Sequence, residues 1–350
     1  MSMTPLELGV LRRGSVRMPQ LPTPRGPLCE FLFSWLRRPV TALPAWPAVP
    51  SDLLADEDAV LALYVCYELH YRGFDGVDED WEWEPTLLQL RRELEAAFLA
   101  CLRDVAGPVV VHGDVEDRLV ELLQISHGPS LSEYMATESS LDQLLEFHVH
   151  RSPYQLKEAD AHTWALPRLA GAAKAALVEI QADEYGEGIE KNMHSELFAL
   201  CMREVGLDAT YGAYLNHVPA VTLATVNVAT FFGLHRRWRG ALVGHLAVFE
   251  MTSVEPMGRY SVALRRHGFG PWARLFYDTH VVADAHHQTL AARDLAGGLL
   301  RDEPHLFHDV MFGAQALSAV EARFTRHLLG TWREGRSSLR VPLTAGAATA

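Results

Sequence analysis

The sequence predicts an all-α protein, and three observations support this fold class. Long segments carry apolar residues three and four positions apart, as amphipathic helices do, and residues 86–105 are the clearest example. Proline and glycine stand mainly between such segments, where they end helices. No two neighbouring segments alternate apolar and polar side chains as paired strands would. With 350 residues, 49% of them hydrophobic, the chain can bury a large core.

The N-terminal part is expected to form two regions. Prolines recur through residues 1–52, and because proline lacks an amide donor, we expect an irregular arm with a short helix at residues 31–37 only. Helical periodicity returns over residues 53–150, which we interpret as an accessory helical layer. Pro85 favours a helix start, and so do Ser139 and Ser140 as cap residues. The predicted helices are 57–71, 86–105, 116–123, 130–136 and 141–150.

The main bundle is expected over residues 151–335, followed by a frayed tail at residues 336–350. Residues 221–232 are rich in small and β-branched side chains and would also suit a strand. We favour a buried helix there, because no neighbouring segment offers a partner strand. The predicted helices are 162–181, 183–202, 221–232, 237–252, 259–267, 271–294 and 304–330.

Composition excludes several classes of protein. A net charge of −13 argues against a nucleic-acid groove or a site for anionic membranes, both of which need clustered positive charge. The four cysteines are far apart and form no CxxC pair, which indicates neither a zinc ribbon nor a disulfide framework. No segment has the apolar length of a signal peptide core or of a membrane span. We therefore expect a cytoplasmic protein.

One segment, residues 277–288, carries the most informative spacing in the chain. His280, Asp284 and His287 stand at positions i, i+4 and i+7, and therefore share one helix face. Two imidazoles and a carboxylate on one face suit a transition metal such as iron. The alternative is a polar helix surface, because the chain has 17 histidines and His286 adjoins His287.

A second pair lies upstream, in residues 184–198. Glu187 and His194 are seven residues apart, so on one continuous helix they would share a face. Glu190 competes as a partner of His194 at i, i+4, and the other acids of the segment compete as well. The alternative is an exposed acidic helix.

Glu250 is the third element of this interpretation. It stands near the end of an apolar run, residues 241–251. An ionised carboxylate buried in apolar surroundings needs a cation or hydrogen-bond donors. The alternative is a position at the solvent edge near the helix end. Taken together, three carboxylates and three histidines on three helices are typical of a two-metal carboxylate site in a helical bundle.

Four motifs give the chain a resemblance to a known family, the haem-oxygenase-like di-iron oxidases and oxygenases, also described as iron-containing redox enzymes. The resemblance covers about residues 150–332 and extends to residues 64–90. It implies a haem-oxygenase-like seven-helix bundle without haem, two Fe²⁺ ions and O₂ as co-substrate. The motifs are DEYGEG (183–188), MHSELF (193–198), GHLAVFEMTS (244–253) and YDTHVVADAHH (277–287). The metal ligands that it implies are Glu187, His194, Glu250, His280, Asp284 and His287.

The resemblance also implies a class of reaction. We expect C–H activation of an aliphatic amino acid, by desaturation or intramolecular C–N ring closure, in natural-product biosynthesis with an external electron donor. The alternatives are N-oxygenation of a primary amine or amino acid, and oxidative C–C cleavage or decarboxylation of an amino or fatty acid. Alternatives of other classes are a haem-degrading or thiaminase-like bundle and a metal-free helical binding protein.

A substrate carboxylate needs a cationic or amide-rich partner. The candidates are Arg259, just after the Glu250 helix, and Lys191, beside the Glu187 segment. Residues 221–232 would supply an apolar pocket for an aliphatic chain. Trp238 and Trp272 are candidates for a homodimer interface.

Overall fold

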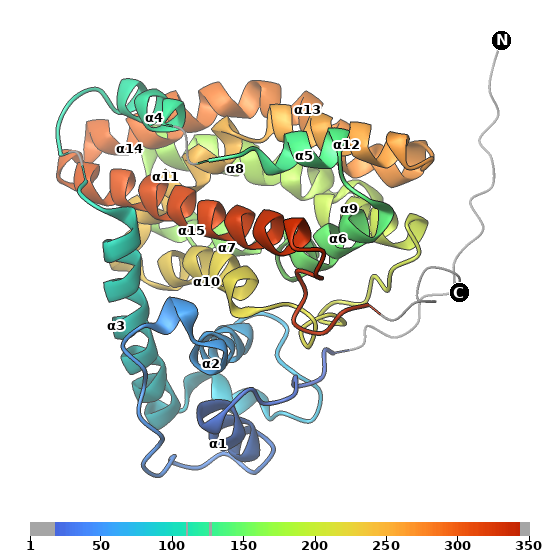
Figure 1. Cartoon of the computed structure of the whole chain (residues 1–350). Helices are drawn as coiled ribbons and strands as arrows, with labels where there is room; N and C mark the ends of the chain where they lie inside the picture. Colours follow the sequence, from blue (N-terminus) through green and yellow to red (C-terminus); the bar gives the residue numbers. More distant parts are fainter. Residues whose placement is uncertain (1–17, 110, 126–127, 344–350) are drawn as a thin grey trace.

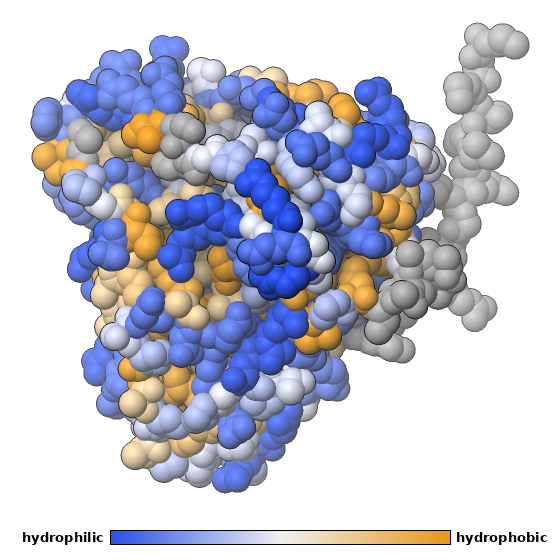
Figure 2. Space-filling model, viewed as in Figure 1, coloured by the Kyte–Doolittle hydropathy of each residue, from blue (hydrophilic) through white to orange (hydrophobic). Residues whose placement is uncertain are grey.

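The computed structural model describes residues 18–109, 111–125 and 128–343, and every regular element in these ranges is a helix (Figure 1). The predicted all-α class is confirmed. The first 17 residues of the expected arm and residues 344–350 of the expected tail lie outside the described residues. None of the described helices is long and apolar enough to cross a membrane. Figure 2 shows a face on which hydrophilic residues predominate, with apolar residues scattered among them.

The first part of the N-terminal region packs below the bundle in Figure 1 and is built around α2 (Glu57–Glu68), which is almost entirely buried. The Asp56 carboxylate caps α2 by accepting from the amides of Asp58 and Ala59. Asp58 in turn accepts from two amides in the first turn of α1, and so joins the two helices. The other elements of this part are α1 (Pro27–Leu36), η1 (Leu53–Ala55), η2 (Glu79–Trp83) and α3 (Pro85–Ala106). Helices α4 (Val115–Gln124) and α5 (Leu131–Thr137) lie at the top of Figure 1, against the bundle helices.

The bundle itself consists of long helices whose apolar faces meet in one core. Helices α11 and α15 cross with their backbones nearly in contact. A Cβ on Gly244 would lie 1.8 Å from the carbonyl oxygen of Val310, and one on Gly313 would lie 1.9 Å from that of Ala241. Only glycine fits at both positions, and the close crossing fixes the helix that carries Glu250.

The bundle helices are α6 (Leu141–Gln155), α7 (Asp160–Thr163), α8 (Gly171–Glu184), α9 (His194–Glu204), α10 (Ala220–Leu234), α11 (Arg239–Met251), α12 (Val254–Arg266), α13 (Pro271–Thr289), α14 (Gly297–Asp302) and α15 (Phe307–Arg333). Short 3₁₀ turns connect several of them: η3 (Leu166–Arg168), η4 (Gly186–Gly188), η5 (Glu190–Asn192), η6 (Arg236–Trp238) and η8 (Pro304–Leu306). A π-helical stretch, η7 (Leu290–Ala296), follows α13. The boundary that we expected between residues 150 and 151 falls inside α6.

The segment expected as one helix over residues 183–202 is interrupted. Helix α8 ends at Glu184, α9 begins at His194, and η4 and η5 lie between them. Gly186 and Glu187 both have left-handed backbone angles, with φ of 61° and 53°. A Cβ on Gly186 would lie 2.5 Å from backbone atoms of Asn192 and Met193, so the turn needs glycine there. The prediction of a continuous helix was wrong, because the two glycines that flank Glu187 favour a turn.

Residues 221–232 form a buried helix, α10, as predicted. It packs against α2 and α15, so both its sides face other helices. Its polar side chains find partners: the amide of Asn227 donates to the carbonyl oxygen of Val60 at 3.1 Å, and Thr230 accepts from Tyr71 at 3.2 Å. The many small residues are explained by close helix packing, and not by a strand.

Candidate metal centre

Two groups of buried ligand-type side chains lie inside the bundle and share one member, Glu184. In each group the potential ligand atoms all lie within 4.8 Å of one another. We call them the first and the second ligand group. The first ligand group is Glu158, Glu184, His194 and His280. The second ligand group is Glu184, Glu250 and His287, and Asp284 contacts it.

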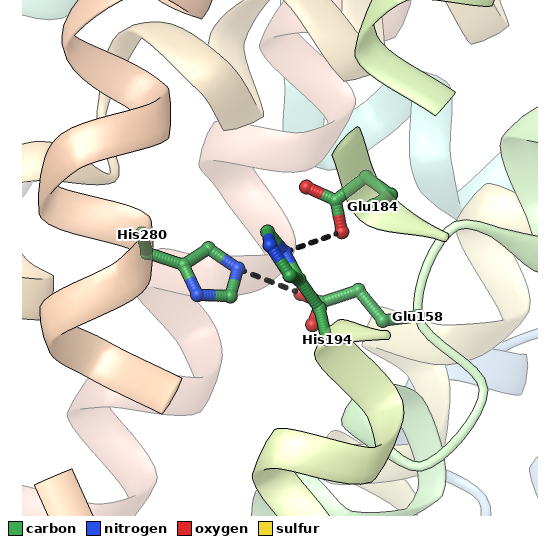
Figure 3. A group of neighbouring side chains, drawn as sticks. All are labelled: Glu158, Glu184, His194 and His280. Atoms are coloured by element: carbon green, nitrogen blue, oxygen red, sulfur yellow. Dashed lines mark ion pairs between the residues drawn. The ribbon is translucent and has the colours of Figure 1, made fainter. Parts of the chain in front are cut away.

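In the first ligand group the side chains point toward a common centre (Figure 3). His194 Nδ1 lies 2.9 Å from Glu184 Oε2, and His280 Nε2 lies 3.6 Å from Glu158 Oε1. The rings of His194 and His280 are 4.2 Å apart between centroids. Three helices and one turn therefore bring two imidazoles and two carboxylates to one point.

Helix ends position most of this group. Glu184 is the last residue of α8 and His194 the first of α9, so the interrupted segment between them brings the two side chains together. Glu158 lies in the turn after α6, just before Ala159, whose φ of 74° is left-handed. A left-handed non-glycine residue is strained, and such strain is found at functional sites.

His280 stands in the middle of α13 and is oriented by its own helix. Its Nδ1 donates to the carbonyl oxygen of Phe276 at 2.8 Å. This bond fixes the ring orientation and leaves Nε2 to face Glu158, which is how proteins prepare a histidine for a metal.

The second ligand group centres on His287, which is fully buried. Its Nδ1 lies 3.3 Å from Glu250 Oε2 and 3.4 Å from Asp284 Oδ1. On its other side, Nε2 donates to Asp183 Oδ2 at 2.8 Å. Asp183 thus orients the ring so that Nδ1 faces the two other carboxylates, as an outer partner of a metal-bound histidine does.

The residues present fit a bound cation, as an observation on hydrogen bonding shows. Glu184 Oε2, His194 Nδ1, Asp284 Oδ2 and His287 Nδ1 are buried without a hydrogen-bond partner among the described residues. His194 and Glu184 approach closely, but their geometry is not that of a hydrogen bond. Four such orphaned atoms would be costly in a core, and a cation held by each ligand group would satisfy them. Imidazole and carboxylate together suit iron.

The carboxylates of the two groups differ in pKa. Burial raises the pKa of Glu184, but the imidazoles of His194 and His280 outweigh it and lower the pKa to about 2. Burial raises the pKa of Glu250 to about 7, because the nearby His287 imidazole offsets only part of the desolvation. The shared carboxylate is therefore ionised at neutral pH, while Glu250 holds a proton more strongly than an ordinary glutamate does.

Nearby carboxylates raise the pKa values of His280 and His287. Burial lowers the pKa of His280, but Glu158 more than offsets this and raises it to about 10. Burial also lowers the pKa of His287, but the carboxylates of Asp284 and Glu250 more than offset this and raise it to about 11. A metal would have to displace both protons.

The structure brings together five of the six ligands predicted from sequence, and Glu187 lies apart from them. Glu187 is exposed on η4 and belongs to neither ligand group. Glu184, three residues earlier and recognised only as a competing acid, lies in both groups. The five that meet are His194, Glu250, His280, Asp284 and His287.

Sequence reasoning missed Glu158 and the orienting Asp183. Glu158 lies in a turn, where no helical spacing marks it, and its only signal is a run of charged residues after an amphipathic helix. Tyr154 was missed too. It lines a small cavity together with Glu158, Glu184 and Glu250, and burial and the charges of these carboxylates raise its pKa well above 10.

The substrate residues predicted from sequence belong to neither ligand group. Arg259 pairs with Glu255 at 2.6 Å and donates to the hydroxyls of Ser130 and Ser132 at 3.5 and 3.4 Å, and Lys191 is exposed on η5. None of residues 221–232 lines the cavities beside the centre. Trp272 is exposed and Trp238 is buried. Their roles in substrate binding and dimerisation stay predictions.

Two cavities lie side by side, and the smaller one adjoins the ligand groups. A small one of about 20 Å³ lies between them and is lined by Tyr154, Glu158 and Glu250, among others. A larger one of about 340 Å³ opens beside it. Phe249, Ser253 and Met257 line both cavities and form the partition between them.

The comparisons with known proteins agree with this arrangement. The search of curated proteins returns no match. The sequence model of the family described as iron-containing redox enzyme matches residues 145–322, which is just over half of the chain. Every residue of both ligand groups lies within this range. The chain therefore belongs to the iron-containing redox enzyme family, with its all-α, haem-oxygenase-like fold and the oxidoreductase activity of that family.

Proposed function

We propose that the protein is a non-haem di-iron oxidase or oxygenase that uses O₂. The observation that carries this proposal is the pair of buried ligand groups that share Glu184. Glu158, His194 and His280 would hold one Fe²⁺ ion, Glu250, Asp284 and His287 would hold the other, and Glu184 would contact both. Helical bundles hold di-iron centres with this kind of inward-facing carboxylate and histidine set.

A ferrous pair, when bound, supplies the electrons that reduce O₂, and an external donor restores them. The protein's own groups shape the space around it. The Tyr154 hydroxyl keeps its proton, because its pKa is raised well above 10, and it can donate a hydrogen bond into the small cavity. Phe249 and Met257 stand between that cavity and the larger one, where they exclude water from the centre.

We further propose that the substrate is an aliphatic amino acid, oxidised by desaturation or by intramolecular C–N ring closure in natural-product biosynthesis. The larger cavity supports this proposal: most of its described lining residues are apolar or uncharged, and it reaches the partition next to Glu250. Its size suits a small molecule with an extended apolar part.

The test has two parts. Anaerobic loading with Fe²⁺ should give about two irons per chain, measured on the desalted protein. The loaded protein is then mixed with pooled amino acids in air, and products are analysed by mass spectrometry. Loss of two hydrogens per turnover supports the proposed oxidation, whereas gain of oxygen indicates N-oxygenation and a shortened product indicates C–C cleavage. Failure to bind iron at all would exclude the di-iron function and favour a metal-free helical binding protein.

A further inference from the structure

The larger cavity has one polar feature that stands out from its lining. Among the described lining residues only Arg151, on α6, and Glu321, on α15, carry a charge. They face each other in a bidentate pair, with both nitrogen–oxygen distances at 2.9 Å. The guanidinium also lies over the rings of Phe147 and Phe324, at 5.7 and 4.4 Å from their centroids.

This pair is not sealed inside the core. The Arg151 side chain keeps 18% of its surface exposed and Glu321 keeps 27%, so a molecule in the cavity can reach both. A helix-to-helix tie could have been made at lower cost with apolar side chains, because an ion pair away from bulk water loses much of its hydration. The pair is therefore a candidate recognition site.

The net charge of the pair is zero, and this restricts what it can bind. A lone carboxylate that bound Arg151 would compete with Glu321 and leave that carboxylate without its partner in an apolar cavity. A lone amine that bound Glu321 would strand Arg151 in the same way. A molecule that carries a carboxylate and an ammonium on one carbon can satisfy both residues together, and its carboxylate suits the fork of a guanidinium.

We propose that Arg151 and Glu321 bind the α-carboxylate and the α-ammonium of an amino acid whose apolar side chain extends along α6 toward the ligand groups. The proposal rests on the proposed function and names the anchor of its substrate. Gln155 lies one helical turn after Arg151 at the end of α6, and Glu158 lies in the turn that follows, so this end of α6 leads from the anchor to the first ligand group. Gln155 lines the cavity between them.

The end of α6 sets a lower limit on the length of the substrate. Arg151 and Gln155 are four helical residues apart, which is a rise of about 6 Å, and Glu158 lies in the turn that follows. An extended chain advances about 3.4 Å for every three bonds, so a side chain needs more than about five bonds to pass Gln155. Such a side chain is longer than those of the standard aliphatic amino acids. 2-Aminooctanoic acid, with six bonds beyond its α-carbon, is therefore a suitable probe.

The first experiment measures binding and not turnover. Isothermal titration calorimetry on the full chain compares 2-aminooctanoic acid with octanoic acid and with octylamine, each of which lacks one of the two charges. The amino acid should bind at least tenfold more tightly than either. Equal affinity for the three probes, or no binding of the amino acid, would overturn the anchor.

The second experiment uses variants of the pair to change which of the three probes binds most tightly. In Glu321→Gln, Arg151 loses its competitor, so octanoic acid should gain at least tenfold in affinity while 2-aminooctanoic acid loses. In Arg151→Met, octylamine should gain instead. A gain of affinity cannot arise from misfolding. Glu334→Gln, an exposed carboxylate just beyond the end of α15, is the matched control and should keep the wild-type order. An unchanged order in both cavity variants would contradict the proposal.

Iron content separates this proposal from the proposed function. Arg151 and Glu321 belong to neither ligand group, so both variants should bind iron as the wild type does. If the protein binds iron but does not prefer the zwitterion, the proposed anchor is wrong and the di-iron function is unaffected. If it prefers the zwitterion but binds no iron, the anchor is supported and the di-iron function is wrong.

Discussion

The two ligand groups that share Glu184 are built in different ways. In the second group, Glu250, Asp284 and His287 stand inside the long helices α11 and α13. In the first group, Glu158 lies in a turn and His194 opens a helix, so breaks in the chain position them. The second group thus depends on helix packing, and the first on turns that only particular residues can form. Changes to the turns should damage the first group selectively, whereas a change at Glu184 should damage both.

The largest effect is expected at the shared residue. Glu184→Gln keeps the side-chain shape and removes the charge that both groups use. Iron content should therefore fall from about two ions per chain to none at Fe²⁺ concentrations that saturate the wild type. Activity should be lost with it. Glu187→Gln, three residues away and exposed, is the matched control and should retain iron. Iron content of both variants is measured by atomic absorption spectrometry after desalting. Loss of iron in Glu187→Gln, with iron retained in Glu184→Gln, would indicate that Glu187 is the metal ligand.

The next effect distinguishes the groups from each other. Glu158→Gln removes a carboxylate from the first group only, and Glu250→Gln removes one from the second only. Each variant should retain about one iron, with affinity at the damaged position lowered more than the 10–100-fold typical of outer partners. Binding isotherms with Co²⁺, whose d–d bands report coordination, would show which position remains. If either variant lost both ions, the groups would not be separate positions.

The same contrast explains what could be read from the sequence. His280, Asp284 and His287 are spaced at helical intervals and Glu250 stands in a plain apolar run, so local sequence patterns predict these four as candidate ligands. Glu158 and Glu184 lie where helices end, and periodicity carries no information there. The error at Glu187 follows directly: a seven-residue spacing to His194 was read on one helix, while the Gly-Glu-Gly turn breaks it.

The fold was predicted more fully than the centre for a related reason. An amphipathic helix repeats its signal over several turns, as residues 86–105 do, so α3 was found with its Pro85 start. The buried helix α10 was also found, although its composition suits a strand, because no partner strand was present. The cavity pair of Arg151 and Glu321 comes from residues 170 positions apart, and no local pattern joins such residues.

Metal binding should also release protons, because the metal-free and metal-bound proteins differ in protonation. His280 and His287 have raised pKa values of about 10 and 11, so both are charged at neutral pH and must lose protons to ligate. Metal binding at pH 8.5 should therefore release about two protons. At pH 6, Glu250, with a pKa of about 7, should add to this number. Calorimetry with Mn²⁺ in buffers of different ionisation enthalpy measures the release, and a release that did not depend on pH would contradict the assignment of Glu250.

The metal-free protein should also change stability with pH in a defined direction. The pKa values of His280 and His287 are raised above the ordinary value of about 6.5, so their stabilising contribution is complete below pH 6.5. It is lost as pH rises through about 10 and 11. Glu184 acts oppositely: its lowered pKa of about 2 gives stability above pH 4.5 that is lost as pH falls toward 2. Urea midpoints across this range should therefore fall at both ends, and His280→Gln should weaken the alkaline fall.

The smallest effect separates two glycines of the turn that precedes His194. Gly186→Ala would place a Cβ 2.5 Å from the backbone at Asn192 and Met193, in addition to a left-handed φ, while Gly188 has only the left-handed φ and open space. The φ alone costs about 1–2 kcal/mol for alanine, and overpacking adds roughly 1–3 kcal/mol. Both variants should lower the urea midpoint, but only Gly186→Ala should also weaken iron binding in the first group, because its Cβ pushes on the start of α9. Equal effects of the two on iron would mean that the turn does not position His194.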